Sequence, residues 1–297
     1  MNAMDGFSLM SWEHGQTAYK VVGDLNFNMT PLVIVHGGPG STHDSLTCVA
    51  DFVNAIGRPA ILYDQLGCGY STRQLEKSPD FWTINLFKNE LTLLLQHLNI
   101  EENFILLGQS WGGLLVAEYA IDQPPGLKAL ILSSALNDSD LWVKESRILA
   151  NQMPAEIAAM LIKHEDAGTT DHPDYAAAIV LFYAQHICTI PVPQEFKEKM
   201  ERIGKSKHVY NAMWGPSELI CSGTLAHHVI SDRLHRINVP TLAISGSFDL
   251  STPKVNQVFL ANIPEIHWEL YEESSHVPYL EEPAKYQRIL NEFLSGF

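Results

Sequence analysis

Five short apolar runs recur along the chain, and each of them ends in a polar or glycine-rich segment. They occupy residues 32–35, 60–63, 104–107, 129–132 and 241–244. Because almost every position in these runs is apolar, rather than every second one, they are typical of strands buried on both faces of a parallel sheet. Amphipathic stretches lie between the runs, and one carries Leu91, Leu94, Leu95 and Leu98 at helical spacing. The alternation predicts a doubly wound, mostly parallel α/β sheet.

The remaining segments complete this plan. Stretches near residues 8–12 and 17–22 predict an antiparallel start to the sheet, residues 268–271 a last strand, and residues 283–297 a closing helix. The rhythm breaks in the middle of the chain, where buried strands give way to helical patterns interrupted by Pro154, Pro173, Pro191, Pro193 and Pro216. We therefore expect a core of residues 1–136 and 233–297, with a helical cap of residues 137–232 inserted over one edge.

Composition limits the class of protein. The 297 residues are 46% hydrophobic and 18% charged, as in a globular protein with one large domain or a core and a cap. The formal net charge of -15 argues against nucleic acid as a partner and is compatible with small cationic substrates. No apolar run approaches the ~20 residues of a membrane span, so no membrane partner is predicted. The first ten residues lack a signal-peptide pattern, and we expect a cytoplasmic protein.

Neither the cysteines nor the histidines form a metal-binding pattern. The four cysteines, at positions 48, 68, 188 and 221, are scattered, so we interpret them as reduced thiols. The adjacent pair His227 and His228 does not face one way on a helix, as two ligands at i and i+4 do. The sequence therefore predicts no metal site.

The sequence GQSWG at residues 108–112 carries the strongest chemical signal. It follows one of the apolar runs and precedes a helical pattern that starts near Leu114, so Ser110 stands at a strand-to-helix turn. This arrangement is the nucleophile elbow of an α/β-hydrolase, where glycines flank a tight turn that lifts the serine hydroxyl above the sheet. We therefore predict an α/β-hydrolase fold with Ser110 as its nucleophile.

A serine nucleophile needs a base, and the base needs a carboxylate that orients it. In this fold the chain order is serine, then acid, then histidine. Asp249 lies in the loop after the run 241–244, and His276 follows the predicted last strand. Because such residues belong in loops at the carboxyl ends of strands, we predict Asp249 as the acid and His276 as the base.

The oxyanion hole is predicted from a second glycine-rich segment. The sequence HGGPG at residues 36–40 follows a strand and has few side chains that would block a substrate. Backbone N–H groups at this point can stabilise a developing oxyanion, together with the N–H of the residue after the nucleophile. We predict Gly38 and Trp111 as the two donors, with Gly37 as the alternative to Gly38 and a neighbour of the substrate.

Four motifs together resemble the proline iminopeptidase family of α/β-hydrolases. They are HGGPG at 36–40, DQLGCGYS at 64–71, GQSWGG at 108–113 and WGPSE at 214–218. The resemblance covers nearly the whole chain, cap included. It implies a cofactor-independent enzyme that cleaves after an N-terminal residue, often proline, or hydrolyses an amino-acid amide such as prolinamide. The implied partner is therefore a small peptide or amino-acid amide.

The same resemblance implies a binding residue for the substrate's free amino group. That role belongs to the glutamate of the WGPSE motif, Glu218, and the physics agrees, because an ammonium entering a partly dry pocket needs a carboxylate partner. Trp214 is a candidate wall for the pyrrolidine ring, although an isolated tryptophan is as often part of the core. Two departures favour an amidase over a peptidase. Leu250 replaces a second acid after the catalytic aspartate, and Leu66 replaces an arginine common in family aminopeptidases.

Two alternatives remain open at this stage. A carboxylesterase or other acyl hydrolase would keep Ser110, Asp249 and His276 but would not need Glu218. A non-catalytic ligand receptor of the same fold could retain the whole triad. Epoxide hydrolases and haloalkane dehalogenases are excluded, since they need a carboxylate where Ser110 stands.

Overall fold

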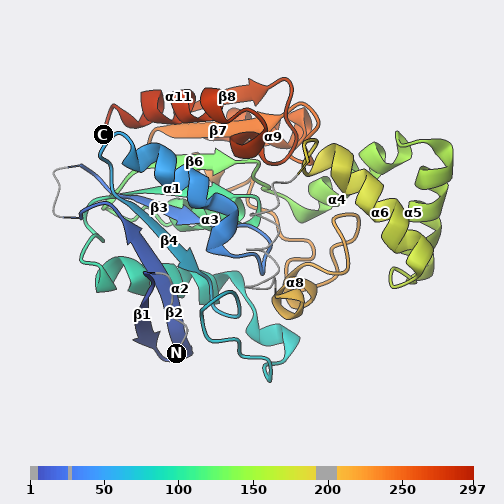
Figure 1. Cartoon of the computed structure of the whole chain (residues 1–297), viewed down its shortest axis with the longest axis horizontal. Coiled ribbons are helices and arrows are strands. Elements are labelled where there is room, and N and C mark those ends of the chain that lie inside the picture. Colours follow the sequence, from blue (N-terminus) through green and yellow to red (C-terminus); the bar gives the residue numbers. More distant parts are fainter. Residues whose placement is uncertain (1–5, 26–28, 192–205) are drawn as a thin grey trace.

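The computed structural model describes residues 6–25, 29–191 and 206–297. These residues contain an eight-stranded sheet in the order β1-β2-β4-β3-β5-β6-β7-β8 (Figure 1). The strands are β1 (Ser8–Trp12), β2 (Gly15–Val22), β3 (Leu32–Val35), β4 (Ala60–Asp64), β5 (Phe104–Gln109), β6 (Leu127–Ser133), β7 (Thr241–Gly246) and β8 (Ile266–Tyr271). The pairs β1–β2 and β2–β4 are antiparallel, and all later pairs are parallel. The predicted fold class and its antiparallel start are thus confirmed.

Helices cover both faces of the sheet. The core helices are α1 (Thr47–Asn54), α2 (Ile84–His97), α3 (Trp111–Ile121), α9 (Pro253–Asn262), α10 (Pro278–Glu281) and α11 (Pro283–Leu294). Successive residues of a strand point to opposite faces, which β3 illustrates. Val33 and Val35 pack in the cluster that holds residues of α2, α3 and α9. Leu32 and Ile34 pack instead with residues of α1 and α11.

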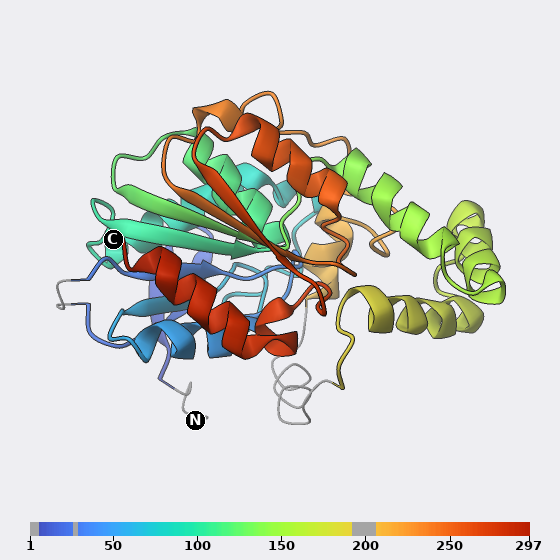
Figure 2. The ribbon, with the colours of Figure 1, turned by 90° about the horizontal axis from the view of Figure 1, so that it is seen from above.

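Further helices lie between β6 and β7 in the described part of the chain. They are α4 (Ser139–Asn151), α5 (Ala155–Ala167), α6 (Pro173–His186) and α8 (Lys207–Met213). Figures 1 and 2 show α4, α5 and α6 projecting beyond one end of the sheet, with α8 between them and the core. Buried residues of these helices, such as Trp142 and Phe182, belong to the same hydrophobic cluster as the core. The boundaries at 137 and 232 therefore stay a prediction.

A charged cluster fixes the chain where it returns to the core. Glu118 of α3 is buried and accepts hydrogen bonds from His228 at 2.7 Å and from the Arg233 guanidinium at 2.9 and 3.0 Å. Burial alone would raise the pKa of Glu118, but these two partners outweigh it and lower the pKa to about 2.

Among the described residues, no helix combines the length and apolar character that crossing a membrane requires.

Candidate active site

Ser110 stands at the sharp turn between β5 and α3. Its backbone has φ 57° and ψ -121°, a left-handed region that is costly for a residue with a side chain. The flanking glycines have no room for one. A Cβ on Gly108 would lie 2.2 Å from the carbonyl oxygen of Gly112, and a Cβ on Gly112 would lie 2.2 Å from that of Val35. The turn therefore has the geometry that the sequence predicts for a nucleophile elbow.

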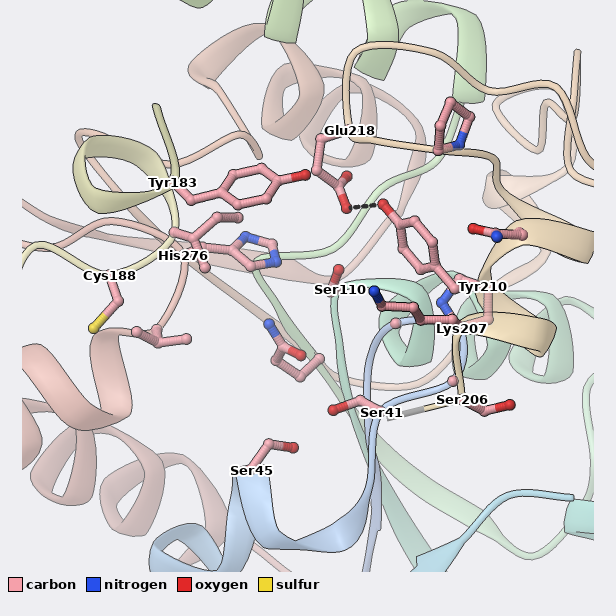
Figure 3. Close-up of a pocket in the computed structure, with 18 of the residues that line it drawn as sticks. Ser41, Ser45, Ser110, Tyr183, Cys188, Ser206, Lys207, Tyr210, Glu218 and His276 are labelled. Carbon is pink, nitrogen blue, oxygen red and sulfur yellow. Dashed lines mark hydrogen bonds between the residues drawn. The ribbon is translucent and has the colours of Figure 1, made fainter. Parts of the chain in front are cut away.

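His276 and Asp249 meet at the carboxyl end of the sheet. The Nδ1 atom of His276 lies 2.7 Å from Oδ1 of Asp249, and both side chains are buried. The same carboxylate oxygen accepts the backbone N–H of Ser251 at 2.9 Å, which holds it in place. Because Asp249 binds Nδ1, the other ring nitrogen of His276 is left for the cavity, where His276 and Ser110 are both wall residues (Figure 3).

The surroundings of His276 favour its protonated form. Burial acts in the opposite direction and is the largest single influence on this imidazole. The charge of Asp249 and its hydrogen bond, together with the charges of Glu218 and Glu281, outweigh burial and raise the pKa of His276 above its ordinary value of 6.5. A histidine in this position accepts a proton readily once it is neutral.

The backbone donors predicted for an oxyanion lie beside Ser110. Gly38 has φ 116° and lines the cavity, and its N–H donates to no described residue. Trp111 is the first residue of α3, so its N–H has no acceptor within the helix. Gly37 packs against the elbow, since a Cβ added there would lie 3.1 Å from Cβ of Ser110. The structure thus places Gly37 and Trp111 against Ser110, and Gly38 on the cavity wall that Ser110 shares.

The cavity over Ser110 has a volume of about 750 Å³ and is bounded by core and cap residues. Its wall residues that bear on the argument are Gly38, Ser110, Asp171, Tyr183, Lys207, Tyr210, Glu218 and His276. Glu218 is held by two donors on different helices. The indole N–H of Trp142 donates to Oε2 at 2.9 Å, and the Tyr210 hydroxyl donates to Oε1 at 2.7 Å (Figure 3 draws the second). One cavity therefore joins a serine, a histidine and an oriented carboxylate.

Sequence reasoning missed the three aromatic residues that surround Glu218. Trp142 lies on α4, Tyr183 on α6 and Tyr210 on α8. Burial, followed by the nearby charge of Glu218, raises the pKa of both tyrosines above the ordinary value, so their hydroxyls remain protonated donors. No local motif marked these residues, because they converge on Glu218 only after the cap helices pack.

The prediction for Trp214 as a wall of the substrate pocket is wrong. Trp214 is buried, with 3% of its surface exposed, and it is not among the residues around the cavity. Its indole N–H donates to the carbonyl oxygen of Ser217 at 2.8 Å. Trp214 therefore supports the turn that carries Glu218 through this hydrogen bond, and its ring packs in the hydrophobic core.

Comparison with known proteins places this geometry in a family. Residues 30–283 match the model of the alpha/beta hydrolase fold family. A proline iminopeptidase of Levilactobacillus brevis is 38% identical over 285 residues, covering 95% of this chain and 93% of that protein. One of Clostridium botulinum is 38% identical over 297 residues and covers 99% of both chains. The chain belongs to the proline iminopeptidase family.

Solved structures agree with this membership. VinJ superposes with a TM-score of 0.93 at 39% identity, and the match covers 98% of both chains. The proline iminopeptidase of Mycobacterium smegmatis gives a TM-score of 0.88 at 36% identity, with the same coverage. As a member of the proline iminopeptidase family with this fold, the protein is a hydrolase.

Proposed function

We propose that the protein is a serine aminopeptidase or amidase that releases an N-terminal residue, proline above all, from short peptides or amino-acid amides. One observation carries the proposal. The Ser110 and His276 side chains face the same cavity as Glu218, whose carboxylate is fixed by Trp142 and Tyr210. An esterase would need only Ser110 and His276. A substrate with a free amino group also explains why an oriented carboxylate, Glu218, faces the same cavity.

In the proposed reaction His276 takes the proton of Ser110 while Asp249 orients its ring. The Ser110 oxygen attacks the carbonyl carbon of the substrate, and the N–H groups of Gly38 and Trp111 stabilise the negative charge that develops on the carbonyl oxygen. His276 then gives its proton to the leaving amine or ammonia, the C–N bond breaks, and an ester to Ser110 remains. Water, deprotonated by the same histidine, attacks that ester, and His276 returns the proton to the Ser110 oxygen as the free amino acid leaves.

Glu218 sets the length of the acyl part in this proposal. It stands on the cavity wall that also holds Ser110, and in this proposal the amino group bound to it limits the acyl part to one residue before the scissile carbonyl. The residue after Asp249 is Leu250, where some family members carry a second acid. Leu250 is completely buried and packs in the hydrophobic core, so the residue after Asp249 does not contribute to binding the amine. The other carboxylate on the described cavity wall is Asp171 of the cap.

The choice between amidase and aminopeptidase concerns the leaving group. A cavity of about 750 Å³ is of the size that takes a drug-sized ligand, which is far more than prolinamide fills. The volume therefore favours leaving groups larger than ammonia, such as the remainder of a peptide, while prolinamide remains a small substrate of the same site.

A panel of matched substrates tests the proposal with wild-type protein and Ser110→Ala. It contains proline p-nitroanilide, N-acetyl-proline p-nitroanilide, prolinamide, a Pro-Gly-Gly peptide and p-nitrophenyl acetate. We expect turnover of the proline substrates that have a free amine and a loss of ~10³-fold or more in Ser110→Ala. The ratio of prolinamide to peptide hydrolysis separates amidase from aminopeptidase. Acetate hydrolysis that exceeds the others, with no effect of N-acetylation, would instead identify an esterase.

A further inference from the structure

Gln65 follows β4 in the DQLG segment, and the proposed chemistry gives it no role. It is almost completely buried, with 1% of its surface exposed, and it is not among the residues around the cavity. Its side-chain amide makes hydrogen bonds in opposite directions, and its Nε2 also lies 3.2 Å from Nδ1 of His36. Nε2 donates to the carbonyl oxygen of His36 at 2.8 Å, and Oε1 accepts the indole N–H of Trp111 at 2.9 Å. One amide therefore connects the segment after β3 to the first residue of α3.

On the β3 side the connection continues through the ring of His36. The backbone N–H of Gln65 donates to Nε2 of His36 at 3.1 Å, so that nitrogen is unprotonated. Burial lowers the pKa of His36 to about 4, and the neutral ring carries its proton on Nδ1. Nδ1 then donates to the carbonyl oxygen of Gly37 at 2.9 Å. Gln65 thus fixes His36 at its backbone and at its ring.

The carbonyl of Gly37 and the N–H of Gly38 belong to one peptide unit. Because that unit is planar, the direction of the carbonyl also sets the direction of the N–H. The Gly37 carbonyl accepts the shorter hydrogen bond from His36 and a longer one, at 3.3 Å, from the backbone N–H of Ser41. The bond from His36 therefore helps to aim the Gly38 N–H, which is one of the two proposed oxyanion donors. The other donor is the backbone N–H of Trp111, the residue whose indole Gln65 holds. The ring of Phe87 supports that indole edge-on, with 5.8 Å between ring centroids.

We propose that Gln65 is a positioning residue that sets the relative placement of the two oxyanion donors, Gly38 and Trp111. The donors come from different strand ends, and the Gln65 amide joins them through side-chain hydrogen bonds. This inference rests on the proposed oxyanion role of both residues. A rival explanation is that Gln65 only satisfies buried polar groups. That explanation predicts a loss of stability with no specific effect on the chemical step.

The decisive variant is Gln65→Met, which keeps the length of the side chain and removes both hydrogen bonds. Since losing an oxyanion donor outright costs ~10²–10³-fold in kcat, misdirecting the donors should lower kcat by about 10-fold or more. KM should change by less than about 2-fold, because Gln65 does not touch the cavity. Both constants are measured with p-nitrophenyl acetate and with proline p-nitroanilide, and thermal unfolding is recorded in parallel.

The matched control is Arg58→Met, a buried polar residue far from the site. Its guanidinium donates to the carbonyl oxygens of Leu294 and Phe297 at 2.7 and 2.9 Å. Arg58→Met should lower the unfolding temperature and leave kcat per folded molecule unchanged. If Gln65→Met behaves in the same way, with reduced stability and an unchanged kcat, the positioning role is refuted. A change confined to KM would refute it as well.

A milder variant keeps the test readable if Gln65→Met does not fold. Trp111→Phe retains an aromatic ring and the backbone donor but loses the indole N–H that Gln65 accepts. We expect a drop in kcat of several-fold for Trp111→Phe alone. Where Gln65→Met folds, the double variant should show no further additive loss, since both substitutions act through one amide. An unchanged kcat in Trp111→Phe overturns the proposal. The acetate ester reports on the oxyanion donors even if proline substrates are not turned over, so failure of the proposed function would show separately.

Discussion

Trp142 donates its indole N–H to the Glu218 carboxylate across 2.9 Å. The same ring lies edge-on to His276, with 5.9 Å between the ring centroids. A single residue of cap helix α4 therefore contacts both the proposed amine-binding group and the proposed base. Since Trp142 is 1% exposed, packing holds its ring rigidly. The packing of α4 on the core thus helps to fix the position of Glu218 relative to His276.

The contact leads to a prediction for Trp142→Phe. The variant keeps the ring beside His276 but removes one hydrogen bond to the charged group, a bond worth about 1.5–3 kcal/mol. We expect kcat/KM for proline p-nitroanilide to fall about 10-fold or more, and that for p-nitrophenyl acetate to change little. Tyr210→Phe removes the hydrogen bond to the other oxygen of Glu218. It should likewise lower kcat/KM for proline p-nitroanilide and leave that for p-nitrophenyl acetate nearly unchanged. Equal losses on both substrates would mean that Trp142 acts through His276.

Glu218→Gln tests the amine-binding role directly. The substitution preserves shape and removes the charge, so a bound ammonium loses its partner in a partly dry cavity. We expect a cost on the order of 2–5 kcal/mol in kcat/KM for substrates with a free amine, and a much smaller one for p-nitrophenyl acetate. Asp171→Asn, at the other carboxylate of the described cavity wall, is the control and should have the weaker effect. A comparable loss on amine and acetate substrates would contradict the assignment.

Much of the fold could be predicted because burial on both faces of a parallel sheet leaves uninterrupted apolar runs. All five runs became strands, and the last strand and closing helix are present as β8 and α11. The antiparallel start was also visible, although β2 begins at Gly15 rather than near residue 17. The arrangement of the cap helices was harder to predict, since a helical pattern in the sequence does not say how the helix axes are oriented. Apolar side chains of the cap join the hydrophobic cluster of the core only once the helices have packed.

The candidate site also has residues that the sequence predicted and residues that it did not. Ser110, Asp249 and His276 each follow a strand, so the sheet edge brings them together, and local motifs mark them. Trp142 on α4 and Tyr210 on α8 reach Glu218, which lies in a turn, and Trp142 is 76 residues away from it in the chain. Such a convergence has no sequence signature, because it depends on the packed cap. Trp214 was misassigned for the related reason that its direction relative to the cavity is not encoded locally.

The raised pKa of His276 predicts the pH dependence of turnover. A general base works only when it is neutral, so activity should rise as pH increases through the pKa of His276. Because that pKa lies above 6.5, the midpoint of the acid limb of kcat/KM should also lie above 6.5. The acetate ester is the substrate of choice, since it has no titrating amine. Glu281→Gln removes one of the charges that raise the pKa and should move the midpoint to lower pH. A midpoint below 6.5 would contradict the proposed environment.

A second titrating group lies beneath the DQLG turn. Glu90 of α2 is completely buried and accepts the Thr17 hydroxyl at 2.5 Å and the Leu66 backbone N–H at 2.9 Å. Burial raises the pKa of Glu90 from 4.5 to about 8, although both hydrogen bonds oppose the rise. The folded protein therefore holds a proton on Glu90 at pH values where the unfolded chain has released it.

This difference makes stability depend on pH with a definite sign. The native state binds the extra proton between pH 4.5 and about 8, so the contribution of Glu90 is fully present below 4.5 and is lost as pH rises to about 8. The loss is on the order of 4–5 kcal/mol at most. Glu90→Gln cannot titrate, so its free energy of unfolding relative to wild type should rise by several kcal/mol between pH 5 and 8.5 in denaturant melts. Glu102→Gln, at an exposed glutamate, controls for the removal of one carboxylate and should run parallel to wild type. Parallel curves for Glu90→Gln as well would show that the buried carboxyl is already ionised in the fold.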